Sequence, residues 1–266
     1  MNYMKKESKR KLGQVSIFII LLVIIVAGIA MVFVFRNNST LSKSTGSNTD
    51  SAEIGEIKNM VEDCVKQRAI DGIRIVGLQG GYVNLPQNYL ATNITNIAYG
   101  YYMGKNTLAT KSEIEKEISD YVEKSVPYCI ESEFNNFNIT KQEPKVTTKI
   151  SPDFVSVSVI MPISAIKESQ AFTLDKVHNN IISVRLGKMI DVANKIINQE
   201  IEEPNYIPLS YLDGVDYNVL VMPSDNDLIY AIVDVSNNSK NEIVPYSFLF
   251  ANRFGGEKWQ TIISKK

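Results

Sequence analysis

An unbroken apolar run near the N-terminus is the strongest constraint on this chain. Residues 15 to 35 form 21 consecutive positions without a charged side chain, and Arg36 closes the run. A helix rises about 1.5 Å per residue, so a run of this length spans the hydrocarbon core of a bilayer, which is about 30 Å thick. The sequence therefore predicts a transmembrane helix over residues 14–36, preceded by a cytoplasmic basic segment over residues 1–13.

The charges beside the run predict its orientation. Five basic residues and one glutamate precede it, whereas Arg36 and Lys43 follow it among neutral polar residues. Basic residues stay on the cytoplasmic side, so we expect a single-pass protein of the cell membrane whose C-terminal part is extracellular. A cleaved secretory signal is the alternative, because Ala27, Gly28 and Ala30 could precede a peptidase site. The run is, however, longer than the apolar core of about 7 to 15 residues that a signal needs.

The residues at the start of the run resemble a known processing site. The string Lys11-Leu12-Gly13-Gln14-Val15-Ser16-Ile17-Phe18 is similar to that of archaeal type IV pilin-like proteins, which carry a class III signal peptide. The resemblance covers the N-terminal segment alone, and it implies cleavage between Gly13 and Gln14 with the helix kept on the mature protein. That family usually has Glu at the fifth position after the cut, where this chain has Phe18.

Polar and small residues follow the run. Residues 37–52 are rich in Asn, Ser, Thr and Gly, which predicts a flexible tether. Pilin helices usually continue from the membrane into the head, so the layout resembles single-span archaeal surface proteins as much as a filament subunit. Residues 53–266 are enough for one extracytoplasmic domain, with a possible sub-boundary near residues 141–145.

The outer part of the chain is mildly acidic. Removing the six basic residues and the one acidic residue of positions 1–36 from the totals of 28 and 29 leaves 22 basic and 28 acidic residues, a net charge of −6. This balance argues against nucleic acid as a partner. The expected partners are the membrane and other surface or pilin-like proteins.

Periodicity predicts an α+β fold in which helices pack on antiparallel sheet. Helical spacing runs from Ile54 to Val65, from Ile114 to Cys129 and from Leu186 to Ile201, with capping boxes expected at Asp50/Glu53 and Ser112/Glu115. Gly80 or Gly81 should cap the first helix, and Pro127 should kink or end the second. Strand patterns occur at residues 97–103, 145–150, 154–161 and 172–177, and a C-terminal meander is expected at residues 217–222, 228–235 and 243–251.

Both cysteines of the chain, Cys64 and Cys129, fall in the outer part. An even count in an oxidising compartment suggests one disulfide, and both residues lie on the expected buried faces of helices. The closed loop of about 66 residues would contribute about 4 kcal/mol in the chain-entropy model. Two buried free thiols are the alternative, and a catalytic cysteine would need an activating base nearby.

Five tyrosines within residues 82–102 are candidates for a recognition surface, because tyrosine combines a flat apolar ring with a hydroxyl group. They are Tyr82, Tyr89, Tyr99, Tyr101 and Tyr102. The alternative is that Tyr99 and Tyr101 pack against the helices and Tyr102 is an ordinary exposed ring.

Candidate chemistry is sparse, and we expect neither a cofactor nor a metal site. The only histidine, His178, has polar neighbours that predict an exposed, inert position rather than a catalytic one. The carboxylates Asp213, Asp216, Asp225 and Asp227 could form a calcium site, but aspartate is common in hairpin turns. Arg185 and Asp234 lie in mainly apolar stretches and could form a buried ion pair.

Glycan attachment has a local signature in this sequence. Five Asn-x-Ser/Thr triplets lie in segments that we expect to be tether, loop or turn. They begin at Asn37, Asn38, Asn93, Asn138 and Asn237.

Two functional classes follow. The first is a non-enzymatic, membrane-anchored surface protein, pilin-like at its N-terminus, whose head has an adhesive, scaffold or binding role. The second is a tethered extracytoplasmic hydrolase that uses paired carboxylates, or a solute-binding module. A deep cleft with two facing carboxylates would favour the second class.

Overall fold

The computed structural model describes residues 48–133, 138–167, 170–174, 177–203, 207–235, 242–243 and 245–254. The chain divides into Met1–Ser51 and a compact unit, Ala52–Lys266, and the description below concerns the second. Among the described residues, no helix is long and apolar enough to cross a membrane. The span expected over residues 14–36, the Gly13-Gln14 processing site and most of the tether lie outside them.

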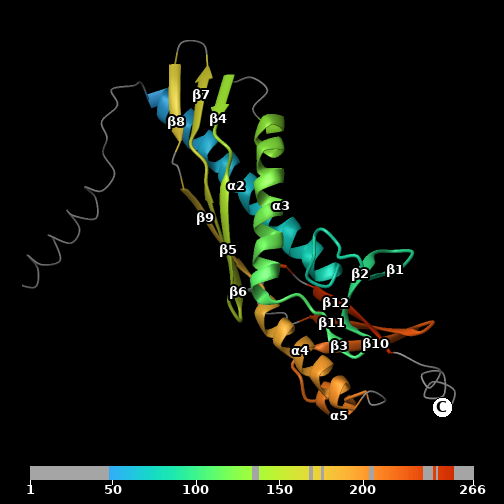
Figure 1. Ribbon diagram of the computed structural model, residues 1–266. Helices are drawn as coiled ribbons and strands as arrows, with labels where there is room; N and C mark the ends of the chain where they lie inside the picture. The colour runs from blue at the N-terminus through green and yellow to red at the C-terminus, as the bar shows by residue number, and fades with distance from the viewer. Residues whose placement is uncertain are drawn as a thin grey trace, which may run out of the picture. The chain divides into compact units, whose positions relative to one another are not determined.

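The fold is α+β (Figure 1). Helices and strands are labelled as in the figure. The helices are α2 (Asn48–Leu78), α3 (Lys111–Glu133), α4 (Leu186–Glu202) and α5 (Leu209–Leu212). The strands are β1 (Tyr89–Ala91), β2 (Asn96–Tyr102), β3 (Lys105–Asn106), β4 (Asn138–Lys141), β5 (Lys145–Ile150), β6 (Phe154–Ile160), β7 (Ile163–Lys167), β8 (Gln170–Leu174), β9 (Val177–Ser183), β10 (Asn218–Ser224), β11 (Asp227–Asp234) and β12 (Tyr246–Arg253).

The largest sheet is mixed, with the strand order β1-β2-β12-β11-β10 and β3 paired to β2. The C-terminal meander was predicted, and β10, β11 and β12 pair antiparallel as expected. The parallel pairing of β2 with β12 was not predicted, and it makes this sheet mixed where an antiparallel sheet was expected. Residues near 100 and near 250 are far apart in sequence, and strand periodicity carries no information about which distant strand becomes the neighbour.

Two smaller antiparallel sheets follow the orders β4-β7-β8 and β5-β6-β9. The β5–β6 hairpin was predicted, with Val155, Val157 and Val159 buried on one face of β6. The stretch expected near residues 172–177 is divided between β8, which pairs with β7, and β9, which pairs with β6. The weak alternation of this region gave no sign of that division.

Helix α2 ends where glycine permits it. Gly80 and Gly81 have φ angles of +73° and +98°, and the Gly81 N–H donates to the carbonyl of Val76. This is the Schellman arrangement, which satisfies a terminal carbonyl of the helix and needs a left-handed residue at the C′ position. At the other end, Asp50 lies inside the helix, which is described from Asn48, so it does not cap it as expected. Residues 48–52, expected in the tether, are also helical.

Helix α3 is capped by Thr110, not by Ser112 as expected. The Thr110 hydroxyl accepts the N–H of Glu113, and the Glu113 carboxylate accepts the N–H of Thr110 at 2.7 Å, which is a capping box. Glu115 instead accepts the N–H of Ile150 at 2.9 Å and so ties α3 to β5. Pro127 lies inside the helix without ending it, and the Lys141 ammonium donates to the Pro127 carbonyl at 2.7 Å.

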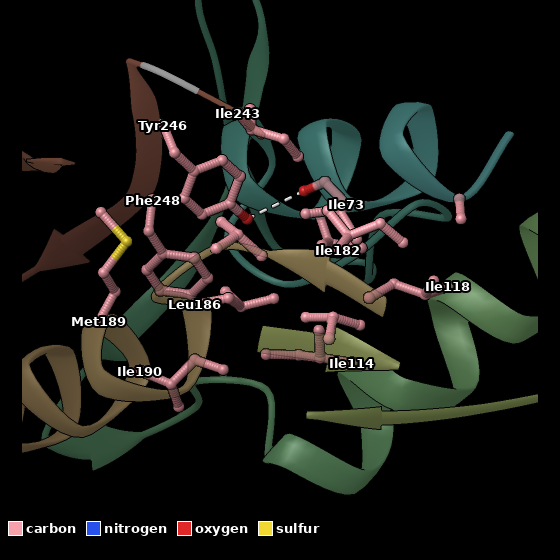
Figure 2. Packing of buried hydrophobic residues seen from close by; sticks show 14 of the residues in the cluster. Ile73, Ile114, Ile118, Ile182, Leu186, Met189, Ile190, Ile243, Tyr246 and Phe248 are labelled. Atoms are coloured by element: carbon pink, nitrogen blue, oxygen red, sulfur yellow. Dashed lines mark hydrogen bonds between the residues drawn. The ribbon is translucent and has the colours of Figure 1, made fainter. Parts of the chain in front are cut away.

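One apolar core joins α2, α3, α4, the β5-β6-β9 sheet and the large sheet. Figure 2 shows its centre, where Ile73 of α2 faces Tyr246 and Phe248 of β12. The buried Tyr246 hydroxyl donates to the Ile73 carbonyl at 2.9 Å, which satisfies a polar group that the core would otherwise leave unpaired. The core therefore positions the polar side chains at the ends of β9, β11 and α4 that are described next.

Candidate functional site

A cluster of charged side chains surrounds Arg185, which directly precedes α4. The Arg185 Nε and Nη2 atoms donate to the two carboxylate oxygens of Asp234 at 2.7 and 2.6 Å. Arg185 Nη1 donates to Asp216 Oδ2 at 2.6 Å, and Nη2 donates to the Asp216 carbonyl at 3.2 Å. The ion pair predicted between Arg185 and Asp234 is therefore confirmed, while its link to Asp216 was not foreseen.

The two carboxylates of this cluster have different surroundings. The side chain of Asp234 is 2% exposed, whereas that of Asp216 is 90% exposed. The guanidinium carbon of Arg185 lies 4.3 Å from the centre of the Tyr217 ring, a cation–π contact. Burial raises the pKa of the Tyr217 hydroxyl to about 12, and hydrogen bonding to Asp234 raises the pKa of Arg185 above its usual value. The guanidinium is thus held in one orientation on its inner side, and its outer side meets a carboxylate that is open to solvent.

A cavity of about 230 Å³ opens beside this cluster. It combines guanidinium, carboxylate, phenol and amide groups with two valines. Its lining residues are Arg185, Val215, Asp216, Tyr217, Asn218 and Val235. The Tyr217 hydroxyl is buried and has no hydrogen-bond partner in the part of the chain that the structure describes.

A second polar group, Glu200 of α4, lies fully inside the core. Its carboxylate accepts hydrogen bonds from the Tyr230 hydroxyl of β11 and the Asn252 side chain of β12. The Asn252 side-chain oxygen in turn accepts the N–H of Tyr101 at 3.0 Å. Burial raises the pKa of the Glu200 carboxyl to about 7, although both hydrogen bonds to it act in the opposite direction. Glu200 therefore links α4 to two strands of the large sheet.

The five tyrosines do not form the single recognition surface that was considered. Tyr99 and Tyr101 are buried in β2, Tyr82 and Tyr102 are partly buried, and Tyr89 is 42% exposed. The Tyr99 hydroxyl donates to Asp227 at 3.2 Å, and the Tyr101 ring packs 4.9 Å from the ring of Phe254. The strand is covered on both faces, which its alternating sequence did not indicate.

The structure corrects one further expectation. His178 is not exposed: it lies in β9, opposite Val159, and is 2% exposed. Of the aspartates weighed as calcium ligands, Asp216 binds Arg185 and Asp227 binds Arg253 at 2.7 Å. No group of three or more residues suited to hold a metal ion occurs in the described ranges.

The predicted disulfide is present in the structure. It joins Cys64 of α2 to Cys129 of α3, with their Cα atoms 6.1 Å apart. Cys64 is buried, and the bridge lines a cavity of about 330 Å³ together with Asp63 and Arg68. The bond fixes two helices whose apolar faces already meet in the core.

The candidate modification sites are only partly described. Gly13, Gln14, Asn37, Asn38 and Asn237 lie outside the described residues. Asn93 is exposed in the turn between β1 and β2, where the Thr92 hydroxyl accepts the N–H of Thr95 at 3.1 Å. Asn138 lies in β4, so the expectation of a loop there was wrong.

Comparisons with protein families, with curated proteins and with solved structures find no match to this chain.

Sequence reasoning missed Tyr217, Asn218 and Glu200. A signal for Glu200 existed, because it follows Ala193 and Ile197 at helical spacing and so falls on the buried face of α4. Ile201 was placed on that face instead, but it is 37% exposed. Tyr217 and Asn218 carried no local signal, since only the fold brings them to Arg185.

Proposed function

We propose that this chain is a membrane-anchored, extracytoplasmic surface protein with a pilin-like N-terminus and a binding or scaffold head. The apolar run over residues 14–36 would be the anchor, and the acidic head would face the outside of the cell. The proposal assigns no catalytic step to the head. Its partners would be the membrane and other surface or pilin-like proteins.

The Cys64–Cys129 disulfide is the observation that carries this proposal. Disulfides persist in oxidising compartments and are rare in the reducing cytosol. A bridge between two core helices of the head therefore supports an extracytoplasmic location, in agreement with the orientation that the flanking charges predict. The exposed triplet at Asn93 adds an acceptor position for a surface glycan.

N-terminal sequencing of the protein isolated from membranes tests the anchor. A mature start at Gln14 would support pilin-type processing, and an intact Met1 would leave a plain signal anchor. A start near Met31 would overturn the membrane proposal, because the apolar run would have been removed.

Thiol alkylation tests the compartment. Cells would be lysed under denaturing conditions in a large maleimide reagent, once without reduction and once after reduction. We expect a shift in gel mobility for Cys64 and Cys129 only after reduction. Modification of both thiols without reduction, in protein from unstressed cells, would contradict the extracytoplasmic placement. A variant with both cysteines changed to serine controls for other modified groups.

A tethered hydrolase that uses paired carboxylates is the second candidate. Glu123 and Glu143 line a cavity of about 330 Å³ with the exposed Tyr128. Glu123 accepts the N–H of Val146 at 2.9 Å, so one oxygen of this carboxylate already has a structural role. Hydrolysis of nitrophenyl glycosides by the full chain, abolished in Glu143→Gln and retained in Glu131→Gln, would favour this candidate over the first.

A further inference from the structure

We propose that the cavity beside Arg185 binds a neutral, hydroxyl-rich ligand, one sugar unit of a glycan, through Asp216, Asn218 and Arg185. The biological role of such binding rests on the proposed surface location. The site itself is argued from side chains of the head alone.

The donor side of the site is held rigidly before any ligand arrives. Asp234 is buried and takes two parallel hydrogen bonds from Arg185, a geometry that fixes the plane of the guanidinium. The Tyr217 ring lies under the same group at 4.3 Å. Asp234 and Asp216 accept four of the five guanidinium N–H groups, which leaves one Nη1 N–H to donate to a ligand. Because this donor is already fixed, it loses little conformational entropy on binding.

The remaining groups combine acceptors and donors. The Asp216 carboxylate is 90% exposed, and its Oδ1 is an acceptor in addition to the Oδ2 atom that binds Arg185. The exposed Asn218 side chain supplies both a donor and an acceptor, and both residues line the cavity. Sugar hydroxyls donate and accept at once, so adjacent hydroxyls can use a carboxylate and an amide together.

The charge balance around the cavity disfavours ions. Three carboxylates, those of Asp234, Asp216 and Asp153, raise the pKa of the Tyr217 hydroxyl, and Arg185 lowers it. Lys188 pairs with Asp153 at 2.5 Å, so two cations face three anions and the local charge is about −1. An anionic ligand would be repelled by this charge, and an ammonium group would have to approach the Arg185 guanidinium. A neutral ligand meets neither penalty.

The size and the apolar lining agree with a single sugar ring. A volume of 230 Å³ equals roughly seven or eight water molecules. Val215 and Val235 supply apolar contacts, and the Val235 side chain is largely exposed. The carbon-bound hydrogens of a sugar ring could cover this surface while the hydroxyls bind the polar groups.

Saturation-transfer NMR on the full chain tests the proposal. The protein would be held in micelles of a detergent without a sugar head group and mixed in turn with glucose, galactose, mannose and N-acetylglucosamine. Acetate and methylammonium would serve as the ionic probes. We expect transfer to the ring protons of at least one sugar and none to either ion.

Site variants assign the signal to the cavity. Asp216→Ala and Asn218→Ala should each weaken binding on the order of tenfold, the effect of losing one hydrogen bond to a charged or polar group. Asp213→Ala, an exposed change outside the cavity lining, should leave binding unchanged. Both site residues are exposed, and circular dichroism would verify that the variants fold.

Three results would overturn the proposal: no transfer to any of the four sugars, equal binding by the Asp216→Ala and Asp213→Ala variants, or preferential binding of acetate. If the mature chain is membrane-bound and its disulfide is formed, the proposed surface location stands even when one of these three results is obtained. Conversely, sugar binding by a chain with free cytosolic thiols would overturn the surface location and leave this site standing.

Discussion

Glu200 is a carboxyl group with no exposed surface, and its two hydrogen-bond donors, Tyr230 and Asn252, are both neutral. Enclosing a carboxylate without a cation is costly, and the protein reduces this cost by favouring the protonated form. The buried carboxylate of Asp234 differs from Glu200, because it is paired with the positively charged guanidinium of Arg185. We therefore expect Glu200 to make the stability of the protein depend on pH, and Asp234 to be costly to remove.

The first prediction concerns pH. The folded pKa of Glu200 is about 7 and its ordinary value is 4.5, so protonation stabilises the folded state. This stabilisation is fully present below about pH 4.5 and is lost as the pH rises through about 7. The loss lowers the free energy of unfolding by about 3 kcal/mol. Glu200→Gln should flatten this part of the pH profile and raise the free energy of unfolding at pH 8. Urea unfolding at several pH values measures it.

The exposed Glu202 on the same helix supplies the control, and Glu202→Gln should keep the slope of the wild-type profile. If wild type and Glu200→Gln lose stability in parallel between pH 5 and pH 8, Glu200 is not the group that titrates.

The second prediction separates the two partners of Arg185. Asp234→Ala should lower the free energy of unfolding by about 3 to 5 kcal/mol, because it removes the buried partner of a charged group. Asp216→Ala should change it by no more than about 1 kcal/mol, because that carboxylate is 90% exposed. Chemical denaturation compares them. Equal losses in the two variants would mean that burial does not distinguish the two contacts.

At the scale of elements, close approach of one element to another decides where glycine is required. A Cβ atom added at Gly77 of α2 would lie 2.5 Å from the Ser247 carbonyl oxygen and 2.7 Å from the Tyr246 hydroxyl. The helix therefore packs directly on the backbone of β12. Gly55 on the same helix has nothing within 4 Å of such an atom.

The third prediction uses this pair. Gly77→Ala should destabilise the protein by about 1 to 3 kcal/mol, because α2 or Tyr246 must move. Gly55→Ala should be neutral or should stabilise by up to about 1 kcal/mol, since alanine is the better helix former. Thermal unfolding of both variants tests the prediction. Stabilisation by Gly77→Ala would show that α2 does not approach β12 as described.

The fourth prediction concerns the start of α3. Thr110→Ala should cost about 1 kcal/mol, because it removes the hydroxyl that accepts the N–H of Glu113. Ser112→Ala, at the position expected from sequence, should change stability by less than about 0.5 kcal/mol. The helix begins at Lys111, so its N-cap position is Thr110. A larger loss in the Ser112 variant than in the Thr110 variant would reverse this assignment.

At the scale of the whole head, the disulfide and the large sheet join segments that are distant in sequence. The Cys64–Cys129 bridge closes a separation of 65 residues, and Tyr101 bonds Asn252 across 151 residues. Closing loops of this length costs chain entropy, which core packing and the covalent link together offset. Residues from both ends of this compact unit therefore meet in its main core.

The fifth prediction is that the double change Cys64→Ser and Cys129→Ser lowers the free energy of unfolding by about 4 kcal/mol in the chain-entropy model. Adding a reductant to the wild type should give a similar loss, and it should have no further effect on the double variant. Urea unfolding with and without reductant measures both. Unchanged stability in the double variant would mean that the bridge adds nothing to the packing of α2 and α3.

The sequence by itself determined the local features. Helical spacing identified α2, α3 and α4, alternation identified β5, β6 and the β10–β11–β12 meander, and glycine identified the end of α2. These features depend on neighbours within a few residues, where periodicity and capping act. The same reasoning placed Cys64 and Cys129 on facing helices and proposed the contact between Arg185 and Asp234.

Only the tertiary structure decided which surfaces are covered. Tyr101 is buried in the main core, Tyr99 is buried in a small cluster with Ile97 and Ala251, and His178 is buried in β9. The cavity beside Arg185 exists because the residues after α5 and the end of β11 meet at the start of α4. Such neighbours are set by packing between segments far apart in the chain, for which the order of residues carries no local signal.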